Sequence, residues 1–485
     1  MENGLLFQGF EWYLPDDGNY YKNMILKLDE LKEIGVTAIW IPPVYKATGT
    51  SDTGYGSYDL YDLGEFDQKG SIRTKYGTKE ELKQLIKEIH KRKMKVYADV
   101  VLNHKAGADR TEKFMAVMVD KNDRNKDVGE PQEIEAWTGF DFPGRDDKYS
   151  DFKWTHYHFS GVDYDNLTKN NAIYRIVGEN KGWNLGVSDE KGNFDYLMFS
   201  DIDLAHPEVK EELKKWAIWF IDELDLDGFR MDALKHMDEV FVEEFLSHIK
   251  EYKGEDFYIL GEYWIDDLDV NNSFLDSINY KLDLFDVGLH FNLYNASKMG
   301  LKYDLRKIFD NIIVKTHPLL SVTFVDNHDS QPGESLESFI EPWFKEIAYG
   351  IIFLRKDGYP CLFYGDYYGT GGENPQPGDK EKIEKLAKIR KKFAYGEQND
   401  YFESDSAIGW VRLGNKEYPN KCAVIISIGD INTIRMFVGK EESGKTYTDY
   451  TGNNEGKVNI DEDGFGDFMV SPGSISVWIE DNIDL

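Results

Sequence analysis

The segment KVYADVVLNH (95–104) joins an apolar run to a polar end, and this combination decides the fold. A short apolar run of this kind is typical of a buried parallel strand. Three further segments have the same form: LDGFRMD (226–232), FYILGEYW (257–264) and SVTFVDNHD (321–329). In barrels of alternating strands and helices, catalytic groups lie at the C-terminal ends of the strands. The polar ends therefore predict one shared site at the mouth of a barrel.

The whole chain follows the same alternation of strand and helix. Apolar runs near 5–12, 36–42, 94–102, 227–232, 257–263, 284–291, 320–325 and 360–365 supply eight candidate strands. Between them, Thr78 and Glu81 form a capping box that starts one amphipathic helix. Pro207 suits the first turn of another, which continues to Leu224. Eight strands alternating with helices predict an α/β fold, the (β/α)8 TIM barrel.

Two regions break this alternation. Residues 104–206 are rich in Gly, Asp, Asn and aromatic residues without a helical period, which predicts an irregular β-rich domain inserted after the third strand. After residue 392, short apolar runs separated by turn residues predict a C-terminal antiparallel β-domain, residues 393–485. Residues 1–103 and 207–392 are then expected to form the catalytic barrel.

Composition narrows the classes of partner. The 485-residue chain has a formal net charge of −32, which argues against nucleic acid and anionic lipid, because both require basic surfaces. No stretch reaches the roughly 18 apolar residues of a membrane span, and no secretory signal is visible at the N-terminus. Two cysteines do not form a disulfide framework. We therefore expect a cytoplasmic protein that acts as a monomer.

The strand ends carry the groups of a carboxylate mechanism. Arg230 and Asp232 are two residues apart on one strand and project to the same face, so the guanidinium favours an ionised aspartate, as a nucleophile requires. Glu262 lies among aromatic residues and other acids, which favours the protonated form that a general acid needs. Asp329 is a third acid. One ionised and one protonated carboxyl is the arrangement that cleaves glycosidic bonds.

Simpler explanations exist for each residue taken alone. A single acid at a strand end is more often a salt-bridge partner or a helix cap, and His104 and His328 could be buried core histidines. Three acids together with Arg230 and both histidines at one barrel end favour a catalytic site. A metal hydrolase is disfavoured because the chain has few histidines and contains no HExxH.

At this point a resemblance can be stated. DVVLNH (99–104), GFRMDALKH (228–236), ILGEYW (259–264) and FVDNHD (324–329) resemble the four signature regions of the α-amylase family of (β/α)8 glycoside hydrolases. They occur in that family's order, with its long insertion after the third strand. Four more segments resemble the bacterial liquefying α-amylases: FQGFEWY (7–13), GYGSYDLYDLGEF (54–66), HYHFSG (156–161) and FDYLMFSDID (194–203).

The resemblance implies roles for the site residues. Asp232 would be the nucleophile, Glu262 the acid and then the base, and Asp329 a stabiliser of the transition state. Retention of configuration requires the carboxyl groups of Asp232 and Glu262 to lie about 5–5.5 Å apart. The substrate contacts that it implies are Tyr55, Asp99, His104, Arg230, Lys235, His236, Trp264 and His328. Asp99 could equally be a structural partner of Arg230, and the Lys235–His236 pair favours an α-amylase over an α-glucosidase.

The resemblance also implies a structural calcium ion. Its ligands would be Asn103, Asp195, Asp201 and the main-chain oxygen of His236, and oxygen donors of this kind suit Ca²⁺. Some bacterial relatives carry a calcium–sodium–calcium cluster nearby. Three acidic positions of that cluster are Ser160, Asn184 and Ala205 here, although Asp203 remains, and two extra residues lie near 179–181. We therefore expect one calcium ion and no metal triad.

Taken together, the sequence predicts endo-acting, retaining hydrolysis of internal α-1,4-glucosidic bonds in starch, glycogen or maltodextrin. One alternative is an α-glucan transglycosylase on the same scaffold, which differs in whether water or a sugar accepts the glycosyl group. Another is a non-catalytic glucan-binding protein, which the presence of all three acids disfavours.

Overall fold

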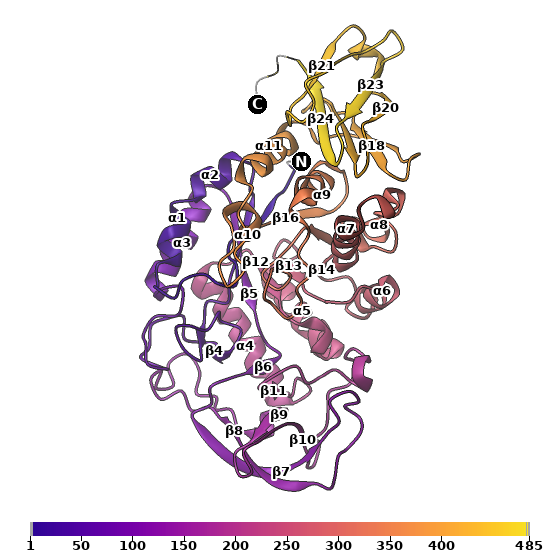
Figure 1. Ribbon diagram of the computed structural model, residues 1–485. Coiled ribbons are helices and arrows are strands. Elements are labelled where there is room, and N and C mark those ends of the chain that lie inside the picture. Colours follow the sequence, from indigo (N-terminus) through magenta and orange to yellow (C-terminus); the bar gives the residue numbers. More distant parts are fainter. Residues whose placement is uncertain (1–2, 482, 484–485) are drawn as a thin grey trace.

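A computed structural model describes residues 3–481 and residue 483, and its centre is a closed barrel of eight parallel strands (Figure 1). The strands are β1 (Leu6–Gln8), β2 (Ala38–Ile41), β5 (Lys95–Val100), β12 (Gly228–Met231), β13 (Tyr258–Gly261), β14 (Asp283–Phe285), β15 (Ser321–Phe324) and β16 (Tyr359–Phe363). The barrel closes because β1 pairs with β2 on one side and with β16 on the other. The predicted (β/α)8 fold is confirmed.

Helices surround the barrel on the outside (Figure 1). They are α1 (Tyr20–Ile25), α2 (Leu28–Glu33), α3 (Lys79–Lys91), α4 (Pro207–Leu224), α5 (Glu239–Lys253), α6 (Leu268–Ser277), α7 (Val287–Met299), α8 (Ile313–Thr316), α9 (Pro342–Leu354), α10 (Tyr364–Tyr368) and α11 (Lys380–Phe393). The predicted capping box is present, since the Thr78 hydroxyl accepts from Glu81 N and the Glu81 carboxylate accepts from Thr78 N. Helix α4 has the predicted bounds and buries Trp216 and Phe220 completely. Among the described residues, no helix is long and apolar enough to cross a membrane.

Two predicted strands are shorter than expected. The run 284–291 is a strand only as far as Phe285, because the Asp286 carboxylate accepts a hydrogen bond from Leu289 N (3.0 Å) and caps α7. This side chain satisfies a free N–H of the first helical turn and so starts a helix where apolar character alone suggested a longer strand. The first run likewise pairs only over Leu6–Gln8, and its remaining residues form a loop.

The predicted β-rich insertion is also present. Its six strands are β6 (His104–Lys105), β7 (Arg110–Met118), β8 (Gln132–Gly139), β9 (Phe159–Asp165), β10 (Asn170–Ile176) and β11 (Ser200–Ile202). They form one sheet in the order β6-β11-β9-β10-β7-β8. Because β6 follows β5 after three residues, this sheet is attached directly to the end of a barrel strand. It lies at the opposite end of the molecule from the C-terminal sheets (Figure 1).

The C-terminal region is antiparallel, as expected. One sheet contains β17 (Gln398–Tyr401), β18 (Ala407–Arg412), β19 (Cys422–Ser427), β24 (Ser474–Glu480), β21 (Thr446–Asp449) and β22 (Lys457–Asn459), and β20 (Asn432–Phe437) pairs with β23 (Phe465–Val470). Trp410 and Trp478 are fully buried and therefore serve packing. The Trp410 indole donates to the main-chain oxygen of Leu354 at the end of α9 (3.3 Å) and so ties this region to the barrel.

Candidate active site

A buried arginine organises the mouth of the barrel. Arg230, on β12, is fully buried, and its Nη1 donates to Asp99 Oδ1 (3.0 Å) and Asp232 Oδ1 (2.5 Å). Asp99 also accepts from Trp40 Nε1 (3.0 Å) and the Tyr55 hydroxyl (2.9 Å). Asp99 is fully buried and engaged by these donors, so its position favours the structural alternative over direct contact with a substrate.

Glu262 faces the same guanidinium from the neighbouring strand end. Its Oε2 lies 3.6 Å from Arg230 Nη2 and accepts a hydrogen bond from Ala233 N (2.9 Å). Burial raises the pKa of Glu262, the nearby Asp232 raises it further, and Arg230 opposes both effects. Ala233 adopts a left-handed conformation (φ 53°), and this strained position directs its N–H to the carboxylate. The side chains of Asp232 and Glu262 keep about one tenth of their surface exposed, so a ligand can reach both.

Asp329 and His328 follow β15 at the same end of the barrel. The Asn327 side chain accepts from Asp329 N (2.9 Å) and Ser330 N (2.8 Å), which fixes the turn. The Gln8 amide donates to His328 Nδ1 (2.9 Å), so the neutral ring carries its proton on Nε2. Burial lowers the pKa of His328, and burial together with Glu262 raises the pKa of Asp329. His328 Nε2 lies 3.3 Å from Asp329 Oδ2.

Stacked aromatic rings form one wall of the site. The Tyr55 ring stacks on His328, with centroids 5.1 Å apart, and on Trp12, with centroids 5.7 Å apart. His104 Nε2 lies 2.8 Å from the main-chain oxygen of Tyr55. Five buried polar atoms of these residues lack a hydrogen-bond partner: Gln8 Oε1, His104 Nδ1, Arg230 Nε, Arg230 Nη2 and His328 Nε2. Because native proteins rarely leave such atoms unpaired, they indicate a polar ligand rich in hydroxyl groups.

Some of these residues were not predicted. Gln8, Trp12 and Trp40 belong to the site geometry although sequence reasoning assigned them no role. The segment FQGFEWY (7–13) was the available signal, since it ends the first predicted strand as the other site segments end theirs.

Of three further predicted contacts, Lys235 and His236 reach the inserted region, whereas Trp264 packs within the barrel. Lys235 Nζ lies 3.2 Å from both the main-chain oxygen of Trp264 and Glu190 Oε2. His236 Nδ1 is 2.7 Å from the main-chain oxygen of Phe194, and burial lowers the pKa of His236 to about 3. The Trp264 ring packs beside His290 and Phe324. The side chains of His236 and Trp264 are thus mostly buried, and Lys235 links the barrel to the insertion.

Three of the four predicted calcium ligands, Asn103, Asp195 and Asp201, belong to one buried acidic cluster. Asn103 Nδ2 donates to Asp201 Oδ1 (3.3 Å), Ser160 donates to Asp201 Oδ2 (2.5 Å), and Asn184 Nδ2 donates to Asp195 Oδ1 (3.0 Å). Burial raises the pKa of Asp195 to about 7 and that of Asp201 well above its usual range, with Asp195 adding to the second shift. Two buried carboxyl groups with oxygen-rich surroundings fit a divalent cation, which would let both remain ionised.

A second group of potential metal ligands has a different explanation. Atoms of His158, His206 and Glu208 lie within 4.8 Å of one another. His158 Nδ1, however, accepts from Thr155 N (3.0 Å), and His206 Nδ1 accepts from Glu208 N (3.3 Å). Both rings therefore carry their proton on Nε2, and His158 donates it to Glu208 Oε2 (3.2 Å). Hydrogen bonding satisfies this group without a metal.

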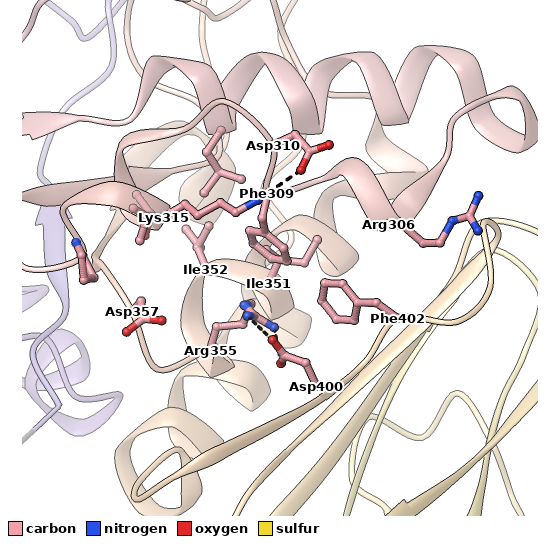
Figure 2. A pocket seen from close by; sticks show the side chains of 14 residues that line it. Arg306, Phe309, Asp310, Lys315, Ile351, Ile352, Arg355, Asp357, Asp400 and Phe402 are labelled. Atoms are coloured by element: carbon pink, nitrogen blue, oxygen red, sulfur yellow. Dashed lines mark hydrogen bonds and ion pairs between the residues drawn. The ribbon is translucent and has the colours of Figure 1, made fainter. Parts of the chain in front are cut away.

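A pocket of about 350 Å³ lies away from the barrel mouth, beside the C-terminal sheet (Figure 2). Phe309, Ile351 and Phe402 line it together with two ion pairs, Arg355–Asp400 (2.9 Å) and Lys315–Asp310 (3.3 Å). None of the predicted site residues lines this pocket. It contains none of the carboxyl groups that contact Arg230, so we do not assign the catalytic centre to it.

The fold and the site together define a class. A closed (β/α)8 barrel with a pair of carboxyl groups, Asp232 and Glu262, beside one buried guanidinium at its mouth fits a glycoside hydrolase. A family model described as "Alpha amylase, catalytic domain" matches residues 17–412, and one described as "Alpha-amylase C-terminal" matches residues 424–479. The chain belongs to the α-amylase family.

Similar proteins cover nearly the whole chain. It is 48% identical to a glucan 1,4-alpha-maltohexaosidase of Bacillus sp. (strain 707), over 98% of this chain and 92% of that protein. It is 48% identical to an alpha-amylase of Bacillus licheniformis, over 99% of this chain and 94% of that protein. A cytoplasmic alpha-amylase of Escherichia coli (strain K12) is 40% identical over the full length of both. The solved alpha-amylase of Geobacillus thermoleovorans has the same fold, with a TM-score of 0.65 at 22% identity over 99% of each chain.

Proposed function

We propose that this chain is an endo-acting α-amylase that hydrolyses internal α-1,4-glucosidic bonds with retention of configuration. The observation that carries the proposal is the contact of one buried guanidinium, Arg230, with both Asp232 and Glu262. The printed names of its relatives, alpha-amylase and maltohexaosidase, agree with this chemistry.

In the first step, Asp232 attacks the anomeric carbon of the bound glucose unit. Glu262 donates its proton to the glycosidic oxygen while the bond from the anomeric carbon to that oxygen breaks. A covalent glycosyl-enzyme forms and the shortened glucan leaves. Arg230 donates a hydrogen bond to Asp232 Oδ1, and burial raises the pKa of Glu262. The raised pKa of Glu262 agrees with its role as the proton donor of this step.

In the second step, Glu262 acts as a base. It takes a proton from a water molecule, whose oxygen attacks the anomeric carbon and displaces Asp232. We assign Asp329 and His328 to hydroxyl groups of the same sugar, because His328 Nε2 and Asp329 Oδ2 lie together at the mouth. Tyr55 would pack against the sugar face, and Asp99 is a positioning residue that holds Arg230 and Tyr55.

A pocket on the inserted sheet supports internal cleavage. A pocket of about 300 Å³ beside β6 is lined by Trp137, Phe199 and Lys105 of the inserted sheet. The Phe199 ring contacts His104, with centroids 5.6 Å apart, which joins this pocket to the catalytic residues. Trp137 is about half exposed, so further glucose units could stack on it.

We also propose one structural calcium ion, held by Asn103, Asp195, Asp201 and the main-chain oxygen of His236. These residues come from a barrel strand end, the inserted region and the loop after Asp232, so the ion would tie the three together.

Starch, glycogen or maltodextrin would be the substrate of a cytoplasmic, monomeric enzyme. We retain residues 1–103 with 207–392, 104–206 and 393–485 as its proposed domains.

Two measurements on the full chain test the proposal. Proton NMR during hydrolysis of maltoheptaose should show the α-anomer as the first product, and an initial β-anomer would contradict retention. Chromatography of the products should show shorter sugars only. Sugars longer than maltoheptaose would favour the transglycosylase, and unchanged maltoheptaose would favour a non-catalytic glucan-binding protein.

A further inference from the structure

A buried lysine lies beside the acidic cluster of the inserted sheet. Lys181 belongs to the loop between β10 and β11, and its side chain is 7% exposed. Its Nζ donates to the main-chain oxygens of Tyr157 (2.5 Å) and Phe159 (3.2 Å) and to Asp203 Oδ2 (2.7 Å). An ammonium group has three N–H donors, so these three oxygens satisfy it completely.

The surroundings of this ammonium resemble those of a metal ion. Main-chain carbonyl oxygens and a carboxylate from separated segments are the usual ligands of hard cations. Here one segment supplies Tyr157 and Phe159, and the other supplies Asp203, which directly follows β11. An ordinary surface ion pair would be exposed, whereas the Asp203 side chain is only 8% exposed.

The charge of Lys181 acts on the whole cluster. Asp203 lies close enough to Asp195 and Asp201 to raise the pKa of each. Within the part of the chain that the structure describes, Lys181 is the only Lys or Arg that forms an ion pair with any of these three aspartates. Its ammonium therefore neutralises one carboxylate and leaves Asp195 and Asp201 without an internal cation.

We propose that the Lys181 ammonium occupies a cation site of the inserted sheet. A side chain of the protein then provides the positive charge that a bound metal ion would otherwise provide to this cluster. The inference rests on the proposed calcium site for its neighbour, but the oxygen cage around Lys181 is an independent observation. The oxygen atoms around the ammonium are ligands that suit a hard cation such as Na⁺ or Ca²⁺. Removal of the Lys181 side chain should leave a site for a free ion.

Two variants of the full chain separate this role from a plain salt bridge. Lys181→Ala leaves a polar cavity that an ion can enter, whereas Lys181→Met fills the same space with apolar atoms. Thermal unfolding is measured with increasing NaCl or with choline chloride at equal ionic strength. We expect NaCl to raise the melting temperature of the Ala variant more than choline chloride does, and to have no such selective effect on Met or the parent chain. Lys169→Ala, on an exposed turn of the same region, is the control.

Metal analysis then counts the ions. The Ala variant, dialysed against sodium-free buffer with excess CaCl₂, should hold one more calcium per chain than the parent. Equal counts together with equal responses to NaCl and choline would overturn the proposal. If the Ala variant does not fold in choline chloride but folds in NaCl, that result supports it, and failure to fold in both contradicts it. A parent chain that binds no calcium would refute the calcium site alone, because the sodium response of the Ala variant is read separately.

Discussion

The barrel mouth and the acidic cluster of the inserted sheet both bury several carboxyl groups, but they neutralise them differently. At the mouth, a guanidinium of the chain itself contacts Asp99, Asp232 and Glu262. In the cluster, the described residues offer Asp195 and Asp201 no arginine or lysine partner. The carboxyl groups at the mouth are thus paired with a cation of the chain itself, whereas the proposed calcium ion would have to neutralise Asp195 and Asp201 from solution.

The largest expected effect comes from removing the proton donor at the mouth, which tests the role of the mouth without changing the acidic cluster. Glu262→Gln should lower kcat on soluble starch by about 10²–10⁴-fold, because the leaving oxygen loses its general acid. Thermal stability and its response to calcium should not change, since the acidic cluster is untouched. Glu255→Gln, on an exposed loop, is the matched control and should keep full activity. Unchanged starch hydrolysis by the Glu262 variant would refute its assigned role.

A second experiment removes the internal cation. Arg230→Met should destabilise the protein by about 3–5 kcal/mol, because Asp99 would remain buried without its partner. Adding Asp99→Asn should recover part of this stability without restoring activity. Denaturant unfolding and starch assays measure the two effects. If the double variant were as unstable as the single one, unpaired charge at Asp99 would not be the cause.

A third experiment removes the external cation. Chelation of calcium should lower the free energy of unfolding by about 2.7 kcal/mol relative to protein in calcium at 100 times its dissociation constant. Asp201→Asn should abolish most of this difference, because it removes one of the two buried carboxylates. Urea unfolding with and without calcium gives the measurement. Identical midpoints for the parent chain would show that the cluster needs no ion.

The smallest expected effect concerns the pH profile. The Lys235 charge lowers the pKa of Glu262, since it favours the ionised carboxylate. Lys235→Met should therefore raise that pKa and move the alkaline limb of kcat/KM to higher pH. Glu190→Gln, which removes the carboxylate paired with Lys235, should not move the limb upward. A downward shift in the Lys235 variant would contradict this assignment.

Sequence reasoning located the barrel and its mouth because both follow from local patterns. The apolar runs and the acids at their ends were sufficient to place Arg230, Asp232, Glu262 and Asp329 on or just after strands of one barrel. The end of the sixth strand was not predictable from hydrophobicity, since a side-chain cap at Asp286 decides it.

Other features depend on contacts between distant segments. The Tyr55 and His328 rings are 273 positions apart in the chain, and only the closed barrel stacks them. Lys181 was visible as part of an extra stretch, but its partners come from two other segments of the inserted region. No local sequence pattern predicts that an ammonium group will be surrounded by two main-chain oxygens and a carboxylate.

The pairing of β1 with both β2 and β16 has a consequence for synthesis of the protein. β1 is made first, but its second neighbour ends only at Phe363. At about 5–20 residues per second, the ribosome needs roughly 20–70 s to travel between them. During that interval the nascent sheet has an unpaired edge that can bind other chains. Chaperone demand should therefore fall sharply once β16 has left the exit tunnel.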